Sequence, residues 1–300
     1  MNVNITGVSG FVGKNLSAYL ANNTFSITSI SLRDKIWKQN LDGDAIIHLA
    51  GKAHDTKNIS DASEYFTINT ELTKELFDFF LESHIKDFIY FSSVKAVADE
   101  VLDILFEDVQ ASPNTPYGKS KLQAEEYILS KVIPRGKRVF IIRPCMIHGP
   151  GNKGNLNLLY NVVKKGIPYP LGAFHNERSF LGIENLNFMI KQILDNKNIS
   201  SGIYNFADDE VLSTNELIKI ISTVINKRKF LLHIPKVIIN GAAKIGDFVK
   251  LPLNSETVQK LTENYRVSNH KIKRAIGIEN LPNTARKGLE KTIESFMEKK

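Results

Sequence analysis

The stretch Gly7-Val8-Ser9-Gly10-Phe11-Val12-Gly13 decides the fold of this chain. It follows an apolar segment, residues 3–6, that suits a buried strand, and it precedes a helical pattern over residues 11–21. Three glycines at this spacing allow a tight turn, let backbone N–H groups approach a pyrophosphate, and let the helix pack closely on the strand. The helix N-terminus then faces the anionic phosphates. The stretch therefore predicts a dinucleotide-binding strand–turn–helix.

Short apolar strands and helical patterns alternate through the first half of the chain. We expect further strands at 25–32, 45–49, 88–92 and 138–143, and helices at 67–83 and 119–130. This alternation is typical of an α/β fold with a Rossmann-type, doubly wound parallel sheet. Too few residues separate Arg33 from Asp44 for an extra strand and helix, so we expect that edge of the sheet to be trimmed.

The pattern changes after Pro144, where glycine- and proline-rich loops appear. Short strands at 179–183 and 203–206 are expected to return to the sheet, and Ser213 or Thr214 is expected to cap a helix through Ile225. The sequence thus predicts a nucleotide-binding Rossmann domain of residues 1–150 plus about 179–206. A smaller, mostly helical C-terminal substrate lobe would comprise residues 151–178 plus 207–300.

Composition restricts the class of protein. The 300 residues are 42% hydrophobic and 24% charged, as in globular proteins, and the single cysteine, Cys145, suits a reducing, cytoplasmic location. We expect no signal peptide, because residues 3–6 already suit a strand that runs into the glycine turn. No apolar run is long enough to span a bilayer, so no membrane partner is expected. The formal charge of +7 is scattered, so nucleic acid is not an expected partner, whereas small polyanionic ligands are. Neither His48 nor His148 sits in a metal-ligand cluster, and no metal is expected.

The residues at the end of the second expected strand indicate whether NAD or NADP binds. An acidic residue there binds the ribose hydroxyls of NAD, whereas an arginine accommodates the 2′-phosphate of NADP. The chain reads Ser31-Leu32-Arg33-Asp34, so Arg33 favours NADP or NADPH. NAD remains possible if Asp34 ends the strand.

A serine, a tyrosine and a lysine form the candidate catalytic group. Ser93 follows the strand at 88–92, at the carboxyl edge of the sheet where ligands bind. Tyr117 and Lys121 are four residues apart, on one face of a helix. A lysine ammonium beside a phenol lowers the tyrosine pKa, so we expect Tyr117 to exchange a proton with an oxygen whose carbon gains or loses hydride. Ser93 would orient that oxygen.

With these pieces in place, the chain resembles the extended short-chain dehydrogenase/reductases, the epimerase/dehydratase group that acts on nucleotide sugars. The resemblance runs over nearly the whole length. Besides the glycine loop, Ser93 and the Tyr/Lys pair, it rests on residues 46–50, Asn69 at a helix start, Arg143-Pro144, His148-Gly149-Pro150-Gly151 and Arg178-Ser179-Phe180.

The resemblance implies roles for single residues. The cofactor would lie against the glycine loop, and Lys121 would also hold the nicotinamide ribose. The other implied cofactor contacts are Gly7, Gly10, Phe11, Val12, Gly13, Arg33, Leu49, Ala50 and Tyr117. On the substrate side the implied contacts are Ser93 and Lys95, with Arg178 pairing a sugar-nucleotide diphosphate and Asn155 donating a hydrogen bond.

Departures from the family pattern narrow the reaction. Dehydratases carry an Asp-Glu pair directly after the catalytic serine or threonine, but this chain has Val94 and Lys95 there, which argues against dehydration. The trimmed edge and Arg33 resemble the 4-keto-sugar reductases of surface-polysaccharide synthesis. We therefore expect NADP(H)-dependent reduction of the C4 keto group of a UDP-2-acetamido-2,6-dideoxy-hexos-4-ulose. Alternatives are an NAD-dependent UDP-hexose 4-epimerase and a non-catalytic NADP sensor. The resemblance also implies a homodimer through the helices at 67–83 and 119–130.

Overall fold

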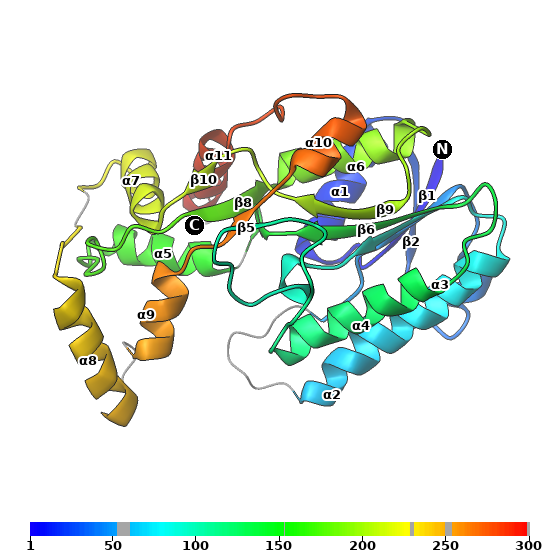
Figure 1. Cartoon of the computed structure of the whole chain (residues 1–300). Coiled ribbons are helices and arrows are strands. Elements are labelled where there is room, and N and C mark those ends of the chain that lie inside the picture. Colours follow the sequence, from blue (N-terminus) through cyan, green and yellow to red (C-terminus); the bar gives the residue numbers. More distant parts are fainter. Residues whose placement is uncertain (53–60, 153, 229–230, 250–253, 299–300) are drawn as a thin grey trace.

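A six-stranded parallel sheet forms the centre of the computed structural model, which describes residues 1–52, 61–152, 154–228, 231–249 and 254–298 (Figure 1). The strand order is β2-β1-β3-β4-β6-β9. The bounds are β1 (Asn2–Thr6), β2 (Ser26–Ile30), β3 (Ala45–His48), β4 (Asp87–Phe91), β6 (Arg138–Pro144) and β9 (Gly202–Phe206). The α/β fold with a Rossmann-type doubly wound sheet is confirmed. The trimmed edge is confirmed too, because β2 is the outermost strand on its side.

Both faces of the sheet are buried, because successive side chains of a strand point to opposite faces. In β4, Ile89 and Phe91 join one apolar cluster, whereas Phe88 and Tyr90 join another. Helices cover each face (Figure 1). On one side lie α1 (Phe11–Asn22), α6 (Ile183–Asp195) and α10 (His270–Ile276), and on the other lie α3 (Leu72–Glu82) and α4 (Pro116–Ser130).

A third apolar cluster organises the C-terminal lobe, between helices and a small sheet of order β10-β8-β7. The strands are β7 (Met146–His148), β8 (Arg178–Gly182) and β10 (Val211–Leu212), and the helices are α5 (Asn155–Lys164), α7 (Thr214–Val224), α8 (Lys236–Val249), α9 (Ser255–Thr262) and α11 (Ala285–Met297). A two-stranded pair, β5 (Ile104–Leu105) and β11 (Arg266–Val267), links the lobe to the main body. No helix of the described chain is both long and apolar enough to cross a membrane.

One predicted strand pairing is wrong. Residues 179–183 were expected to return to the central sheet, but β8 pairs with β7 and β10 instead. The free edge of β6 is occupied by β9, and β7 continues the chain away from the sheet after Cys145, so β8 finds its partner there. The prediction for 203–206 is confirmed by β9. Ser213 caps α7, and Glu216 completes a capping box.

The helix expected to begin near Asn69 begins earlier. It runs from α2 (Ala62–Tyr65) through a π-helical stretch (Phe66–Glu71) into α3. Asp61 caps its start by accepting a hydrogen bond from the Ser63 N–H. Asn69 therefore lies inside a wide helical turn, fully buried, rather than at a helix start.

Candidate active site

The glycine loop forms a cradle in which side chains have no room. Gly7 has φ +74°, which favours glycine, and a Cβ there would lie 2.7 Å from the backbone nitrogen of Ala50. A Cβ on Gly13 would lie 2.7 Å from the Cα of Val8. Gly10 occupies the N-cap position of α1 and provides no side-chain cap, and the first turn holds no acidic residue. The uncapped N–H groups of this turn, at the carboxyl edge of β1, fit a bound pyrophosphate.

A buried histidine fixes the wall of this cradle. His48 Nδ1 lies 2.8 Å from Thr6 Oγ1, which also accepts a hydrogen bond from the Ala50 N–H. His48 Nε2 lies 3.0 Å from Thr73 Oγ1, whose proton goes to the Asn69 carbonyl. Burial, and secondarily the charge on Lys121, lowers the pKa of His48 to about 3. His48 is therefore a neutral structural residue that orients Ala50, next to half-buried Leu49.

Arg33 lies in an exposed turn just past β2, between the sheet and the short 3-10 helix Trp37–Asn40. Phe11 and Val12 are the first residues of α1, beside the glycine turn. The cofactor residues predicted from sequence therefore gather at the carboxyl ends of β1, β2 and β3, which is where a dinucleotide binds in such sheets.

Tyr117 is positioned by the start of α4. Thr115 caps the helix by accepting the Gly118 N–H at 3.2 Å, and Pro116 occupies the first turn. The Tyr117 ring meets the edge of Tyr65, with centroids 6.2 Å apart. Its hydroxyl lies near enough to Ser93, which follows β4 and caps the 3-10 helix Val94–Ala96, for the serine to lower the pKa of the phenol. The structure thus joins the predicted serine and tyrosine.

Burial raises the pKa of the Tyr117 phenol, and the nearby Ser93 only partly opposes this. We expected Lys121 to dominate and to lower that pKa, and the net direction is the reverse, because desolvation disfavours the phenolate. At neutral pH the phenol stays protonated and is ready to donate.

Lys121 is almost completely buried one helical turn from Tyr117. Its ammonium donates to the Phe91 carbonyl at 2.8 Å and lies 4.9 Å from the centre of the Tyr90 ring. Burial lowers the pKa of Lys121 to about 8, although the charge of Glu125 opposes the shift. The lysine can therefore carry its charge at neutral pH but lose it in mild alkali.

Sequence reasoning missed the groups that hold these residues. Glu125 forms a buried ion pair with Arg143 at 2.5 Å and accepts a hydrogen bond from Ser92. A signal existed, because Tyr117, Lys121 and Glu125 follow each other at four-residue spacing on one helix face. Asn69 was noted only as part of the family resemblance. Its side-chain oxygen accepts the Lys52 N–H at 2.7 Å, and its side-chain nitrogen donates to the Lys52 carbonyl at 3.1 Å, so Asn69 orders the chain after β3.

Two of the predicted substrate residues, Lys95 and Arg178, lie near each other and near Glu263. Lys95 donates to the Asp99 carbonyl at 2.6 Å and lies 4.3 Å from the centre of the Tyr265 ring. Burial lowers the pKa of Lys95 despite the charges of Glu263 and Asp99. Arg178, at the start of β8, lies 3.6 Å from Glu263. Asn155 begins α5, and its side chain lies outside the part that the structure describes.

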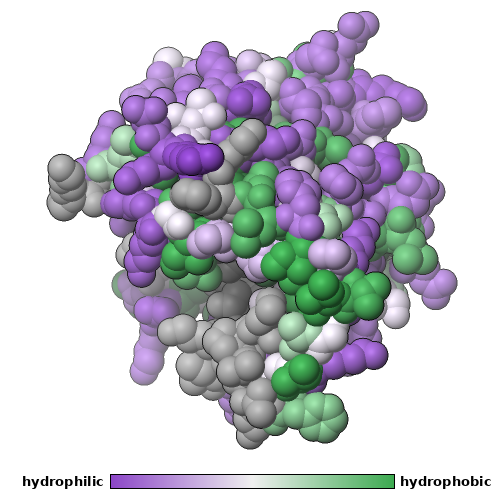
Figure 2. Space-filling view, turned by 90° about the vertical axis from the view of Figure 1, so that its left-hand side faces the viewer, coloured by the Kyte–Doolittle hydropathy of each residue, from purple (hydrophilic) through white to green (hydrophobic). Residues whose placement is uncertain are grey.

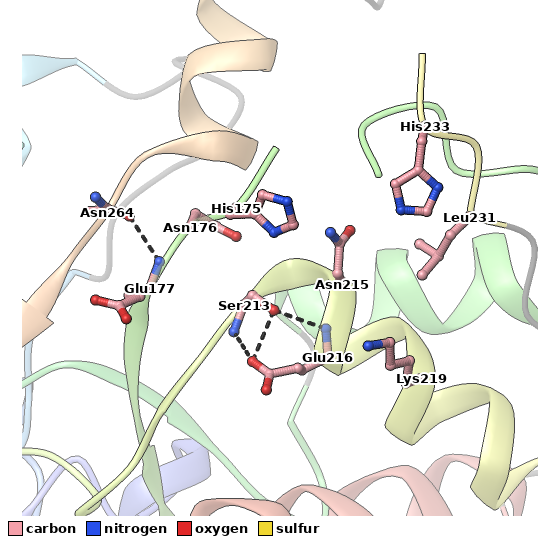
Figure 3. Close-up of a pocket in the computed structure, with 10 residues that line it drawn as sticks. All are labelled: His175, Asn176, Glu177, Ser213, Asn215, Glu216, Lys219, Leu231, His233 and Asn264. Carbon is pink, nitrogen blue, oxygen red and sulfur yellow. Dashed lines mark hydrogen bonds between the residues drawn. The ribbon is translucent and has the colours of Figure 1, made fainter. Parts of the chain in front are cut away.

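An open cleft of about 760 Å³ lies in the lobe next to Arg178 (Figure 3). Polar side chains from four segments line it, among them His175, Lys219 and His233. The Glu216 carboxylate in its wall is held by Ser213. The cleft was not foreseen, because its residues are spread over 175–264 and carry no common motif.

A glycine cradle at the carboxyl edge of a parallel sheet, with a serine, a protonated tyrosine and a buried lysine beside it, defines a dinucleotide-dependent oxidoreductase. The chain belongs to the NAD dependent epimerase/dehydratase family, whose model matches residues 3–207. It is thus an NAD(P)-dependent enzyme of the group that modifies nucleotide sugars.

Its curated relatives include epimerases and reductases. It is 29% identical to a UDP-glucose 4-epimerase of Vibrio cholerae, over 98% of this chain and 95% of the relative. It is 28% identical to a GDP-6-deoxy-D-mannose reductase of Pseudomonas aeruginosa, over 73% and 79%. A UDP-2-acetamido-2,6-beta-L-arabino-hexul-4-ose reductase of the same species is 25% identical over 77% and 59%.

Solved structures agree with the fold. MoeE5 in complex with UDP-glucuronic acid and NAD superposes with a TM-score of 0.79, at 19% identity over 99% of both chains. RMD from Pseudomonas aeruginosa complexed with NADPH gives 0.75, at 22% identity over 99% of both. These neighbours bind NAD in one case and NADPH in the other, so the fold is compatible with both cofactors.

Proposed function

We propose that this enzyme uses NADPH to reduce the C4 keto group of a UDP-2-acetamido-2,6-dideoxy-hexos-4-ulose. The observation that carries the proposal is a buried Tyr117 phenol next to Ser93, whose pKa is raised by burial so that it stays protonated. A reductase needs a proton donor in its resting state, because reduction of a ketone leaves an alkoxide that must be protonated.

The residues divide the work as follows. The nicotinamide cofactor supplies hydride when it is bound. Ser93 donates a hydrogen bond to the C4 carbonyl oxygen and orients it. Tyr117 gives its phenolic proton to that oxygen as the carbon is reduced, and the nearby Lys121 ammonium stabilises the phenolate that remains. Arg178 pairs with the substrate diphosphate.

The two residues after Ser93 support reduction over dehydration. Val94 and Lys95 offer no carboxylate, whereas elimination of water from the sugar needs an acid and a base at those places. Similarity to two nucleotide-sugar reductases, one of them named for a hexul-4-ose, also supports the proposal.

Arg33 supports NADPH as the preferred cofactor. Its position in the turn after β2 suits contact with a 2′-phosphate. Asp34 supports the alternative less well, because its carboxylate accepts the Ile36 N–H at 3.2 Å.

The test is oxidation of NADPH against NADH with enzymatically generated UDP-4-keto-6-deoxy-GlcNAc, followed by loss of absorbance of the reduced cofactor. The wild type should prefer NADPH, and Arg33→Ser should reduce that preference by roughly tenfold. Lys35→Ser, in the same turn, is the matched control. Absence of turnover with both cofactors would refute the reductase proposal, and product NMR would define the C4 configuration.

A second candidate is an NAD-dependent UDP-hexose 4-epimerase. It is favoured by the similarity to the Vibrio cholerae epimerase over nearly the full length of both chains. The same three residues would serve it, with Tyr117 first accepting and then returning a proton. Bound NAD released on denaturation, together with interconversion of UDP-GlcNAc and UDP-GalNAc without added cofactor, would favour the epimerase.

A further inference from the structure

Helix α8 of the substrate lobe turns a row of large apolar side chains to the solvent. Val237, Ile245 and Phe248 are 83%, 64% and 90% exposed, and neighbouring Ile238 is 59% exposed. Positions 237, 238, 245 and 248 lie on one side of the helix, so their side chains form one stripe. We call these four apolar side chains the α8 stripe. Figure 2 shows hydrophobic side chains running down the lower part of the face that carries α8.

The stripe is not the face that holds the helix to the protein. Ile239 and Ala243, on the opposite side of α8, are buried in the apolar cluster of the lobe. Packing against the lobe requires apolar residues on only one side of a helix, whereas α8 carries them on both sides. Contiguous exposed apolar surface of this kind marks an interaction site.

The charges around the stripe indicate what covers it. Helix α8 carries two basic residues, Lys236 and Lys244, and a single acidic one, Asp247, and Lys227 and Arg228 precede it in the chain. Lys244 lies one turn before Phe248 and two turns after Val237, beside the stripe. The Asp247 carboxylate is bound to the N–H and the hydroxyl of Ser255, at 2.9 and 2.6 Å, and so faces α9.

We propose that α8 docks the enzyme peripherally on an anionic phospholipid surface. Its 14 residues are too few to cross a bilayer, but a basic helix with an apolar stripe lies in the plane of the membrane–water interface. The stripe enters the acyl boundary, and the flanking ammonium groups meet lipid phosphates. A second copy of this chain fits less well, because two such basic segments repel each other. Our expectation that the protein has no membrane partner rested only on the absence of a segment long enough to span a bilayer.

The test is flotation of the purified full chain with vesicles. Wild type should float with phosphatidylcholine vesicles that contain phosphatidylglycerol, and not with phosphatidylcholine alone. The double variant Ile245→Ser/Phe248→Ser should lose at least about tenfold in partitioning, because two apolar side chains no longer enter the lipid. Lys244→Glu should weaken binding at low salt and much less at high salt.

The matched control is Leu102→Ser/Val132→Ser, which removes two equally exposed apolar side chains, 101% and 91%, outside the lobe. It should float like wild type. Thermal unfolding midpoints close to wild type would show that each variant folds. Wild type that never floats, or an α8 variant that floats like wild type, would overturn the proposal. Wild-type dimers that dissociate in the α8 variant, without vesicle binding, would replace the membrane by a second copy.

Discussion

Tyr117 is the residue on which the proposed chemistry depends most directly. Removal of its hydroxyl by Tyr117→Phe keeps the ring against Tyr65 but removes the proton donor. We expect kcat to fall by about 10²–10⁴-fold, with little change in the affinity for the dinucleotide. Steady-state kinetics and a titration of cofactor fluorescence measure the two quantities. A variant with wild-type kcat would mean that another group protonates the substrate.

Lys121 gives the enzyme a pH dependence at the alkaline side. Because burial lowers the pKa of Lys121 to about 8, we expect kcat/KM to decline above that pH as the ammonium is lost. Unfolding caused by the deprotonation of Lys121 does not explain this decline of kcat/KM. The unfolded chain, where the lysine pKa is ordinary, binds the extra proton between about 8 and 10.5, so this residue makes folding more favourable as the pH rises through that range.

The profile is measured from pH 6 to about pH 10, alongside the thermal midpoint. Lys121→Arg keeps its charge at every pH in that range, so its residual activity should be flat where that of the wild type falls. A wild-type profile that stays level above pH 9 would contradict a catalytic role for the ammonium.

At the scale of elements, the cap of α4 links helix stability to catalysis. Thr115 and Thr284 are matched caps, each accepting a backbone N–H at 3.2 Å, at the starts of α4 and α11. Replacement of either by alanine should lower the free energy of unfolding by about 1 kcal/mol. Only Thr115→Ala should also lower kcat, because α4 carries Tyr117 in its first turn.

Chemical denaturation and steady-state kinetics on both variants provide the check. Equal losses of activity in the two would mean that α4 holds Tyr117 without its cap. Unchanged stability in both would mean that neither hydroxyl contributes to capping.

Elements that are defined by residues adjacent in sequence could be predicted. Pairings between segments that are distant in sequence could not. The central strands and the glycine turn follow from residues adjacent in sequence. The pairing of β8 does not, because a short, largely buried strand fits either sheet and only the occupied edge of β6 decides. The Glu125–Arg143 pair likewise escapes local reasoning, since it joins a helix to a strand 18 residues away.

At the scale of the whole molecule, α3 and α4 lie side by side on one face of the sheet (Figure 1). The family resemblance implies that this pair meets its copy in a homodimer. We expect the wild type to be dimeric in light scattering. Leu129→Asp, at a position of α4 that is 56% exposed, should shift it toward monomer, whereas Leu102→Asp should not. A monomeric wild type would refute the expectation.

The π-helical stretch at Phe66–Glu71 makes chain length itself part of the active-site geometry. A wide turn accommodates one residue more than an α-helix does over the same rise. Insertion of one more residue, beyond the extra one that the wide turn already accommodates, would rotate everything before it by about 100°. Tyr65 would move away from the ring of Tyr117, and the chain after β3 would lose its hydrogen bond to Asn69. At this place we expect the protein to tolerate a substitution more readily than an inserted residue.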